Sequence, residues 1–111
     1  GVGMRINIKP LSVNEAWKGR RFKTDAYKAY ELEMFYKLPK INVGSEKLSI
    51  KIVVGYSNKL ADIDNFQKPF IDILQKKYNF NDKQIYELHV YKVITEKGKE
   101  FIDFEIETII V

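Results

Sequence analysis

The sequence predicts a small α+β (mixed α/β) single domain, with a mixed sheet of about four strands and two helices packed on it. Hydrophobic residues recur with a period of two in four segments and with a period near 3.6 in two others. These segments follow the order strand, helix, strand, helix, strand, strand, which is typical of helices covering a sheet. A length of 111 residues indicates one domain.

The first two elements lie on either side of a long loop. Residues 4–9 alternate as a strand, and residues 10–24 read as a loop, signalled by Pro10, Ser12, Asn14 and Gly19. Thr24 is placed to cap a helix that runs to about Leu38, and Pro39 stops it. One side of this helix should carry Tyr27, Tyr30, Met34 and Leu38.

The next strand and helix are adjacent in the chain. Residues 47–56 alternate as a strand, with Leu48, Ile50, Ile52 and Val54 on one face. A helix is expected over residues 65–77, capped by Asp64 or Asn65, in a variant capping box with Gln67. Its buried stripe should consist of Phe66, Phe70, Ile73 and Leu74.

The last two strands are expected over residues 84–94 and 100–109. A turn at Gly98 predicts that they pair as a hairpin. In the final strand Ile102, Phe104 and Ile106 should face one way, and Asp103, Glu105 and Glu107 the other. The chain then ends on Ile109, Ile110 and Val111, and alternation should leave at least one of these on the outer face.

Composition narrows the possible chemistry. The chain has no cysteine and one histidine, so disulfides, thiolate metal sites and sites built on several imidazoles of one chain are excluded. Any metal must be held mainly by oxygen, which favours Mg²⁺, Mn²⁺ or Ca²⁺. No apolar run reaches the roughly 20 residues that span a bilayer. No signal-peptide pattern is present, so we expect a cytoplasmic protein. Residues 1–3 look like a cloning remnant, which puts the expected domain at 4–111.

Charge is unevenly distributed. Residues 1–60 carry 12 Lys and Arg against 5 Asp and Glu, whereas residues 61–111 carry 7 against 10. This favours a phosphate-attracting surface beside a carboxylate site, although a solvated basic face is the simpler interpretation.

Acidic residues gather where a strand pattern gives way to a helix pattern. Asp62 and Asp64 are separated only by Ile63. In an extended segment both carboxylates would point the same way, with Ile63 pointing into the core, and their repulsion favours a bound cation. The alternative is that Asp64 only caps the helix.

Lys68 and Asp82 extend this cluster. Lys68 falls on the first helical turn, where it can contact a scissile phosphate or stabilise a leaving oxygen, or else form a simple ion pair with Asp64. If the next strand lies beside the strand before the helix, Asp82 returns to the same sheet end as Asp62; otherwise residues 81–82 are only a polar turn. Three carboxylates and a lysine suit metal-assisted phosphodiester hydrolysis.

A basic and aromatic segment, WKGRRFK at residues 17–23, precedes the first helix. Four cations and two aromatic rings around a glycine can grip backbone phosphates and stack on an unpaired or distorted base. His89 is expected to face solvent or an edge and is assigned no role.

At these residues the chain resembles the RusA-type Holliday-junction resolvases. The resemblance runs from residues 9–27 to residues 82–92. Its core begins with an aspartate, any residue and then Asp-Asn, and a lysine follows three residues after the asparagine. Later in the chain, an acid precedes a glutamine and an aliphatic residue. Those positions are Asp62, Asp64, Asn65, Lys68, Asp82, Gln84 and Ile85.

The resemblance implies a homodimer that uses Mg²⁺ or Mn²⁺ to nick four-way DNA junctions at two symmetric positions, often in prophage-encoded recombination. It implies that Asp62, Asp64 and Asp82 are metal-binding catalytic acids and that Lys68 is their catalytic partner. The family commonly has two consecutive acids where this chain has Asn81 and Asp82. Glu87 is a candidate extra acid, although a purely structural role is the simpler interpretation. DNA contacts are expected from Asn14, Trp17, Lys18, Arg20, Arg21, Lys23 and Asn65.

Two other functions are compatible with these residues. The chain could be a nucleic-acid-binding module that keeps the fold without catalysis, or the same acids could serve an RNA-directed nuclease. The intact set of Asp62, Asp64, Lys68 and Asp82 favours the DNA endonuclease.

Overall fold

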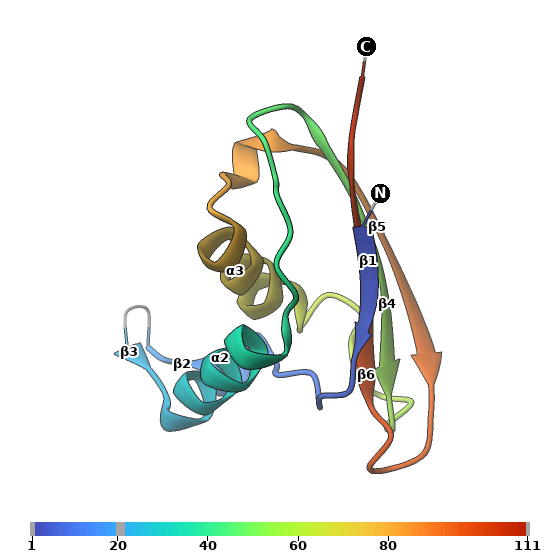
Figure 1. The fold of residues 1–111 in the computed structure, drawn as a ribbon. Helices are drawn as coiled ribbons and strands as arrows, with labels where there is room; N and C mark the ends of the chain where they lie inside the picture. The colour runs from blue at the N-terminus through green and yellow to red at the C-terminus, as the bar shows by residue number, and fades with distance from the viewer. Residues whose placement is uncertain (1, 20–21, 111) are drawn as a thin grey trace.

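The structure, a computed structural model, describes residues 2–19 and 22–110 and confirms the α+β class, with helices on one face of a four-stranded sheet (Figure 1). The elements in chain order are β1 (Val2–Ile6), α1 (Val13–Ala16), β2 (Trp17–Lys18), β3 (Phe22–Lys23), α2 (Asp25–Lys37), β4 (Leu48–Tyr56), α3 (Gln67–Tyr78), the 3-10 helix η1 (Asp82–Gln84), β5 (Ile85–Ile94) and β6 (Phe101–Thr108). β1 begins before the expected start at Met4, because Val2 and Gly3 already pair with β6.

The sheet has the order β1-β6-β4-β5, and the predicted hairpin between the last two strands is wrong. β5 pairs in parallel with β4, β6 pairs antiparallel with β4, and β4 therefore separates β5 from β6. The physical reason lies in β4, whose inward residues are buried almost completely. Partners on both sides satisfy the backbone hydrogen bonds of this central strand.

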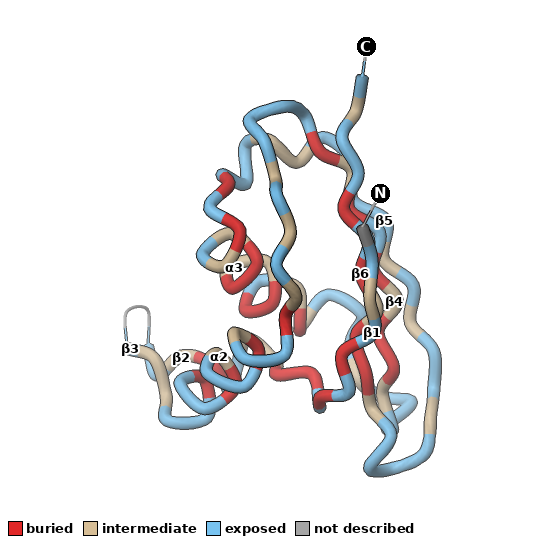
Figure 2. Tube along the Cα trace, viewed as in Figure 1, coloured by how far each residue is buried: buried red, intermediate tan, exposed pale blue. Residues whose placement is uncertain are grey.

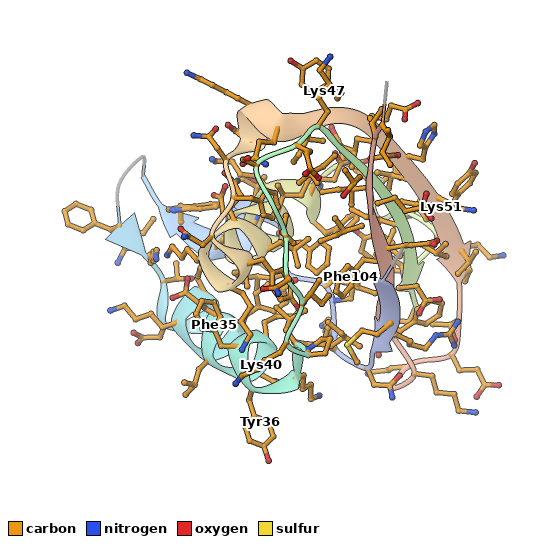
Figure 3. The ribbon with its side chains drawn as sticks, turned by 45° about the horizontal axis from the view of Figure 1, so that its top comes forward. Phe35, Tyr36, Lys40, Lys47, Lys51 and Phe104 are labelled. Carbon is orange, nitrogen blue, oxygen red and sulfur yellow. The ribbon has the colours of Figure 1, made fainter. Side chains whose placement is uncertain are left out.

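The core lies between the sheet and the two long helices. Figure 2 shows buried residues on the helix surfaces that face the sheet. The predicted stripes are confirmed, since every apolar residue assigned to them is buried. Figure 3 shows Phe104 of β6 directed into this layer, where its ring lies 5.8 Å from that of Phe70 on α3. Tyr36, by contrast, points away from α2 into solvent.

Local signals account well for α2. Thr24 is its N-cap, and the Thr24 hydroxyl oxygen accepts a hydrogen bond from the Tyr27 backbone N–H at 3.1 Å. The helix ends at Lys37, just before Leu38 and Pro39, as predicted.

The expected loop over residues 10–24 contains two elements that the prediction missed. α1 begins after Ser12, which forms a capping box with Glu15. β2 and β3 then pair as a short antiparallel hairpin. The pattern Ser-x-x-Glu is a readable helix signal, but α1 spans only four residues, too few to show a hydrophobic period.

Candidate functional site

The segment between β4 and α3, residues 57–66, carries Asp62, Asp64 and Asn65. It consists of successive turns rather than an extended strand end, so the predicted alternation of side chains is wrong here. The backbone N–H of Asn65 donates to the Asp62 carbonyl at 3.3 Å, and that of Gln67 donates to the Asp64 carbonyl at 3.2 Å. Backbone turns therefore decide where each carboxylate points.

The two aspartates lie next to different hollows. Asp62 lines a hollow of about 280 Å³ together with Glu15, Tyr56 and Asn65. Its carboxylate accepts a hydrogen bond from the Asn65 amide at 3.3 Å. Asp64 lines a second hollow, of about 560 Å³, between α3 and β5. We call the second one the α3–β5 hollow; Asp64, Lys68, Asp72, Gln75, Asp82 and Tyr86 contribute to it.

Two further expectations for this segment are corrected. Ile63 does not anchor it, because its side chain is 41% exposed. Phe66 does so instead: it is fully buried, and its ring lies 6.4 Å from that of Tyr56 in an edge contact. α3 has Phe66 as its N-cap without a side-chain hydrogen bond, so neither Asp64 nor Asn65 caps it. Both polar side chains are thus free of that structural task.

Lys68, in the first turn of α3, pairs with Asp72 rather than Asp64. Its Nζ lies 3.4 Å from Asp72 Oδ2 and 5.4 Å from the centroid of the Trp17 ring. The side chain is 65% exposed, so it remains available to a ligand. Lys68 lines both the α3–β5 hollow and a larger hollow beside Trp17.

Asp82 is the first residue of η1, immediately before β5. Because β5 is parallel to β4, its start lies at the opposite end of the strand pair from the end of β4, and the expectation that Asp82 returns to the same end is wrong. The Asp82 backbone N–H donates to Gln75 Oε1 at 2.9 Å, which ties η1 to α3. Asp82 reaches Asp64 only along the length of the α3–β5 hollow.

Asn81 and Gln84 have structural roles around Asp82. The Asn81 side chain accepts from the Lys83 N–H at 2.9 Å, and Gln84 completes a capping box. The Gln84 amide also donates to the carbonyls of Gly44 and Glu46, at 2.9 and 3.0 Å. This pair therefore fixes η1, and with it the position of Asp82.

The pKa of Tyr56 reflects both its burial and the nearby carboxylates. Burial, followed by the charges of Asp64 and Asp62, raises the pKa of Tyr56 to about 12. The Tyr56 hydroxyl donates to the Asp62 backbone carbonyl at 3.3 Å. A neutral phenol at this place holds the turn without adding charge to the site.

The basic segment before α2 lies on the other side of Lys68. Trp17 is half-buried, Lys18 and Asn14 are exposed, and Lys23 is partly buried. Asn14, Trp17 and Lys23 line the same hollow as Lys68, whereas Lys18 does not. Arg20 and Arg21, both predicted DNA contacts, lie outside the described residues.

Two lysines share one carboxylate near this hollow. Lys23 Nζ lies 3.5 Å and Lys76 Nζ 2.9 Å from Glu31 Oε2. The neighbouring Lys76 ammonium, with burial, lowers the pKa of Lys23. The pair leaves a surplus of positive charge that a phosphate can neutralise.

The carboxylates suit a hard divalent cation in their donor chemistry, because every candidate ligand is an exposed carboxylate oxygen. Within residues 2–19 and 22–110, however, no three Asp, Glu or His side chains form a group able to hold a metal ion. Asp64 and Asp82 share a hollow, and Asp62 opens into the neighbouring one.

Comparison with known proteins decides the family. The model of the family described as Endodeoxyribonuclease RusA matches residues 11–105, which is most of the chain and includes every candidate acid. The chain belongs to the RusA endodeoxyribonuclease family. No individual curated protein matches the chain significantly.

RusA proteins are endodeoxyribonucleases that, as a family, act on branched DNA as Holliday-junction resolvases in recombination. The predicted resemblance is thereby confirmed. None of the helices in the described part of this RusA chain is long and apolar enough to cross a membrane.

The structure adds Asp72 and Lys76, which sequence reasoning missed. Asp72 follows Lys68 at a spacing of four, which places the two on one side of a helix and could have predicted their ion pair. Lys76 lies one further turn along the same helix. Its link to Glu31 on α2 is a contact 45 residues apart in sequence, and no local pattern predicts it.

Proposed function

We propose that this RusA chain is a metal-dependent, structure-selective DNA endonuclease that resolves four-way junctions by paired symmetric nicks during recombination or repair. The observation that carries the proposal is the family match over residues 11–105, combined with Asp64, Lys68 and Asp82 along one open hollow. The runner-up is a DNA-binding module of the same fold without catalysis.

Asp62, Asp64 and Asp82 are the proposed acids and metal ligands. Mg²⁺ or Mn²⁺, when bound, would supply the positive charge that activates water and stabilises the leaving oxygen. The roles of the three acids come from their positions in the family pattern, since in the chain alone they do not form one group. Asn65 supports Asp62 through the amide hydrogen bond described above.

Lys68 is the proposed cation at the scissile phosphate. It is exposed, and among the described residues it contacts Asp72 and the Trp17 ring, so it can turn toward a DNA strand in the α3–β5 hollow. A lysine aimed at developing negative charge stabilises the transition state more than the bound substrate.

DNA binding is assigned to the basic segment and its neighbours. Trp17, Lys18 and Lys23 present cations and an aromatic ring on the α1, β2 and β3 side of Lys68, with Asn14 beside them. Arg20 and Arg21 are proposed phosphate contacts from sequence alone. Two copies of the chain as a homodimer would place two such sites on a substrate with two-fold symmetry.

A junction-cleavage assay tests the proposal. The chain is incubated with a labelled four-way junction and Mg²⁺ or Mn²⁺, with linear duplex of the same sequence and chelator as controls. We expect symmetric nicks in the junction alone, and only with metal. Tight junction binding without nicking would instead support the non-catalytic module, and equal cleavage of single-stranded RNA would support an RNA-directed nuclease.

A further inference from the structure

The hollow beside Trp17 is the largest of those described and lies next to the candidate acids, yet the roles assigned so far leave its interior unexplained. Its volume is about 900 Å³, within the range typical of small-ligand sites. We call it the Trp17 pocket; the lining residues used below are Asn14, Trp17, Lys23, Lys68, Gln75 and Lys76.

We propose that the Trp17 pocket binds one unpaired nucleotide of the DNA substrate, with the base against the Trp17 ring and a phosphate at Lys23 and Lys76. The inference rests on the proposed function and deepens it, because it names a subsite for an unstacked base next to the site of cleavage.

The aromatic part of the pocket is held in place. Trp17 makes an edge contact with Tyr27, with ring centroids 5.0 Å apart and an interplanar angle of 65°. Tyr27 is buried in the core, so it fixes the indole, which remains half-exposed to the pocket. A fixed, partly exposed indole is the kind of platform on which single-stranded bases stack.

Lys68 now lies over the indole, 5.4 Å from its centroid. At an exposed site such a cation–π contact is weak, and so is the ion pair of Lys68 with Asp72. A base can therefore replace the lysine on the ring, and Lys68 also borders the α3–β5 hollow. Binding of a nucleotide would thus leave the lysine directed toward the carboxylates.

The charge of the pocket suits a phosphate. Three lysines of its described lining face two carboxylates: Asp72 pairs with Lys68, and Glu31 lies against Lys23 and Lys76. Within residues 2–19 and 22–110, Lys23 and Lys76 share the single carboxylate of Glu31. An added phosphate would give these two ammonium groups a second anion.

The position of the pocket argues for an unpaired nucleotide rather than duplex. α1, α2 and α3 all contribute to its walls, together with β2 and β3. A paired base is stacked on both faces and cannot reach an aromatic ring set into such walls. The exposed amide of Asn14 offers a donor and an acceptor to a base edge, whereas the Gln75 amide already binds Asp82 and Ile71.

Trp17 fluorescence tests this directly, because it is the only tryptophan in the chain. The full chain is titrated with an octamer of thymidylate and with an octamer of abasic residues that carries the same phosphates. We expect saturable quenching by the thymidylate octamer and little by the abasic one. Equal quenching by both, or binding of the thymidylate octamer without quenching, would overturn the base-binding role.

Variants separate stacking from charge, with binding of labelled octamers followed by anisotropy. Trp17→Ala should weaken thymidylate binding by at least about fivefold and leave abasic binding unchanged, whereas Trp17→Phe should retain most of the affinity. Tyr36→Ala is the matched control, because Tyr36 is 90% exposed and does not line the pocket. An equal loss in Tyr36→Ala, or none in Trp17→Ala, would contradict the proposal.

Lys76→Gln should weaken binding of both octamers, and Lys77→Gln, its neighbour outside the pocket, should do so less. Equal losses of affinity in Lys76→Gln and Lys77→Gln would show that the phosphate contact is not specific to the pocket, and would contradict the role of Lys76. Melting curves confirm that each variant folds, and the fluorescence titration of the unmodified chain keeps the test valid if Trp17→Ala does not fold. If the thymidylate octamer quenches the fluorescence but the junction is not nicked, the nuclease function is contradicted and the nucleotide subsite is supported. If the junction is nicked but the quenching does not depend on the base, only the subsite is contradicted.

Discussion

The ammonium group of Lys68 lies 3.4 Å from the carboxylate of Asp72, one helical turn further along α3. This pair places the candidate catalytic lysine between the Trp17 pocket and the α3–β5 hollow. It also means that the charge of Lys68 is partly balanced by a residue outside the family pattern. In the proposed function, a DNA phosphate would have to displace Asp72 from Lys68.

Asp62→Asn should abolish nicking while junction affinity holds or rises. The change removes a proposed metal-ligating charge and reduces repulsion of the phosphates, and the amide oxygen can still accept from Asn65. Nicking rates and anisotropy of a labelled junction measure the two effects, and calorimetry with Mn²⁺ should show weaker metal binding. Asp25→Asn, at the start of α2, is the control. Nicking of the junction by Asp62→Asn at the normal rate would show that Asp62 is not a ligand.

Lys68→Ala should lower turnover much more than junction binding. One cation among many contributes little affinity, whereas a cation aimed at developing charge contributes about 3 kcal/mol, or roughly a hundredfold in rate. Single-turnover nicking at saturating protein isolates the chemical step, and Lys28→Ala on α2 is the exposed control. If rate and affinity fall by the same factor, Lys68 is only a phosphate contact.

Asp72→Asn should tighten junction binding with little loss of stability. An exposed ion pair at a spacing of four contributes only about 0.5 kcal/mol to folding, whereas loss of the carboxylate frees Lys68 for phosphate. The gain in affinity should shrink at high salt, because it is electrostatic. Anisotropy at two salt concentrations and a thermal melt check both statements; weaker binding by Asp72→Asn would point to a direct role for the carboxylate.

Tyr30→Phe should stabilise the fold by about 1 kcal/mol. The Tyr30 hydroxyl is buried and makes no hydrogen bond of good geometry with any described residue, although the Leu11 backbone lies close to it. Tyr78→Phe is the matched comparison, because the Tyr78 hydroxyl donates to the Pro39 carbonyl at 2.7 Å. That variant should lose about 1 kcal/mol. Urea unfolding gives both free energies, and a destabilised Tyr30→Phe would indicate a hydrogen bond to water inside the core.

Light scattering at micromolar concentration should give about twice the 13.1 kDa mass of the chain. One chain carries one set of candidate acids, and two opposed nicks in a junction need two sets. At least one residue of the apolar C-terminus is left outside, as expected: Ile110 is 92% exposed, whereas Ile109 is half-buried and Val111 lies outside the described residues. Ile110→Lys tests whether this end is the interface. A monomeric mass that persists on junction DNA would contradict paired nicking.

The sequence by itself determined the elements that have a strong period or a cap. Thr24 began α2 and Pro39 followed its end, and the buried stripe of α3 fell where the 3.6-residue period placed it. These features depend on contacts within one helix or strand, so neighbouring residues contain the information. The same holds for the family pattern, because the spacing of Asp62, Asp64 and Lys68 is itself a local property.

Only the tertiary structure decided which strands pair and where the acids point. The hairpin expected around Gly98 did not form, because β4 offers two edges and takes β5 in parallel and β6 antiparallel. That arrangement moved Asp82 to the far end of the strand pair, and the turns after β4 sent Asp62 and Asp64 to different hollows. Strand order and turn geometry arise from contacts between residues distant in the chain, which a local period does not record.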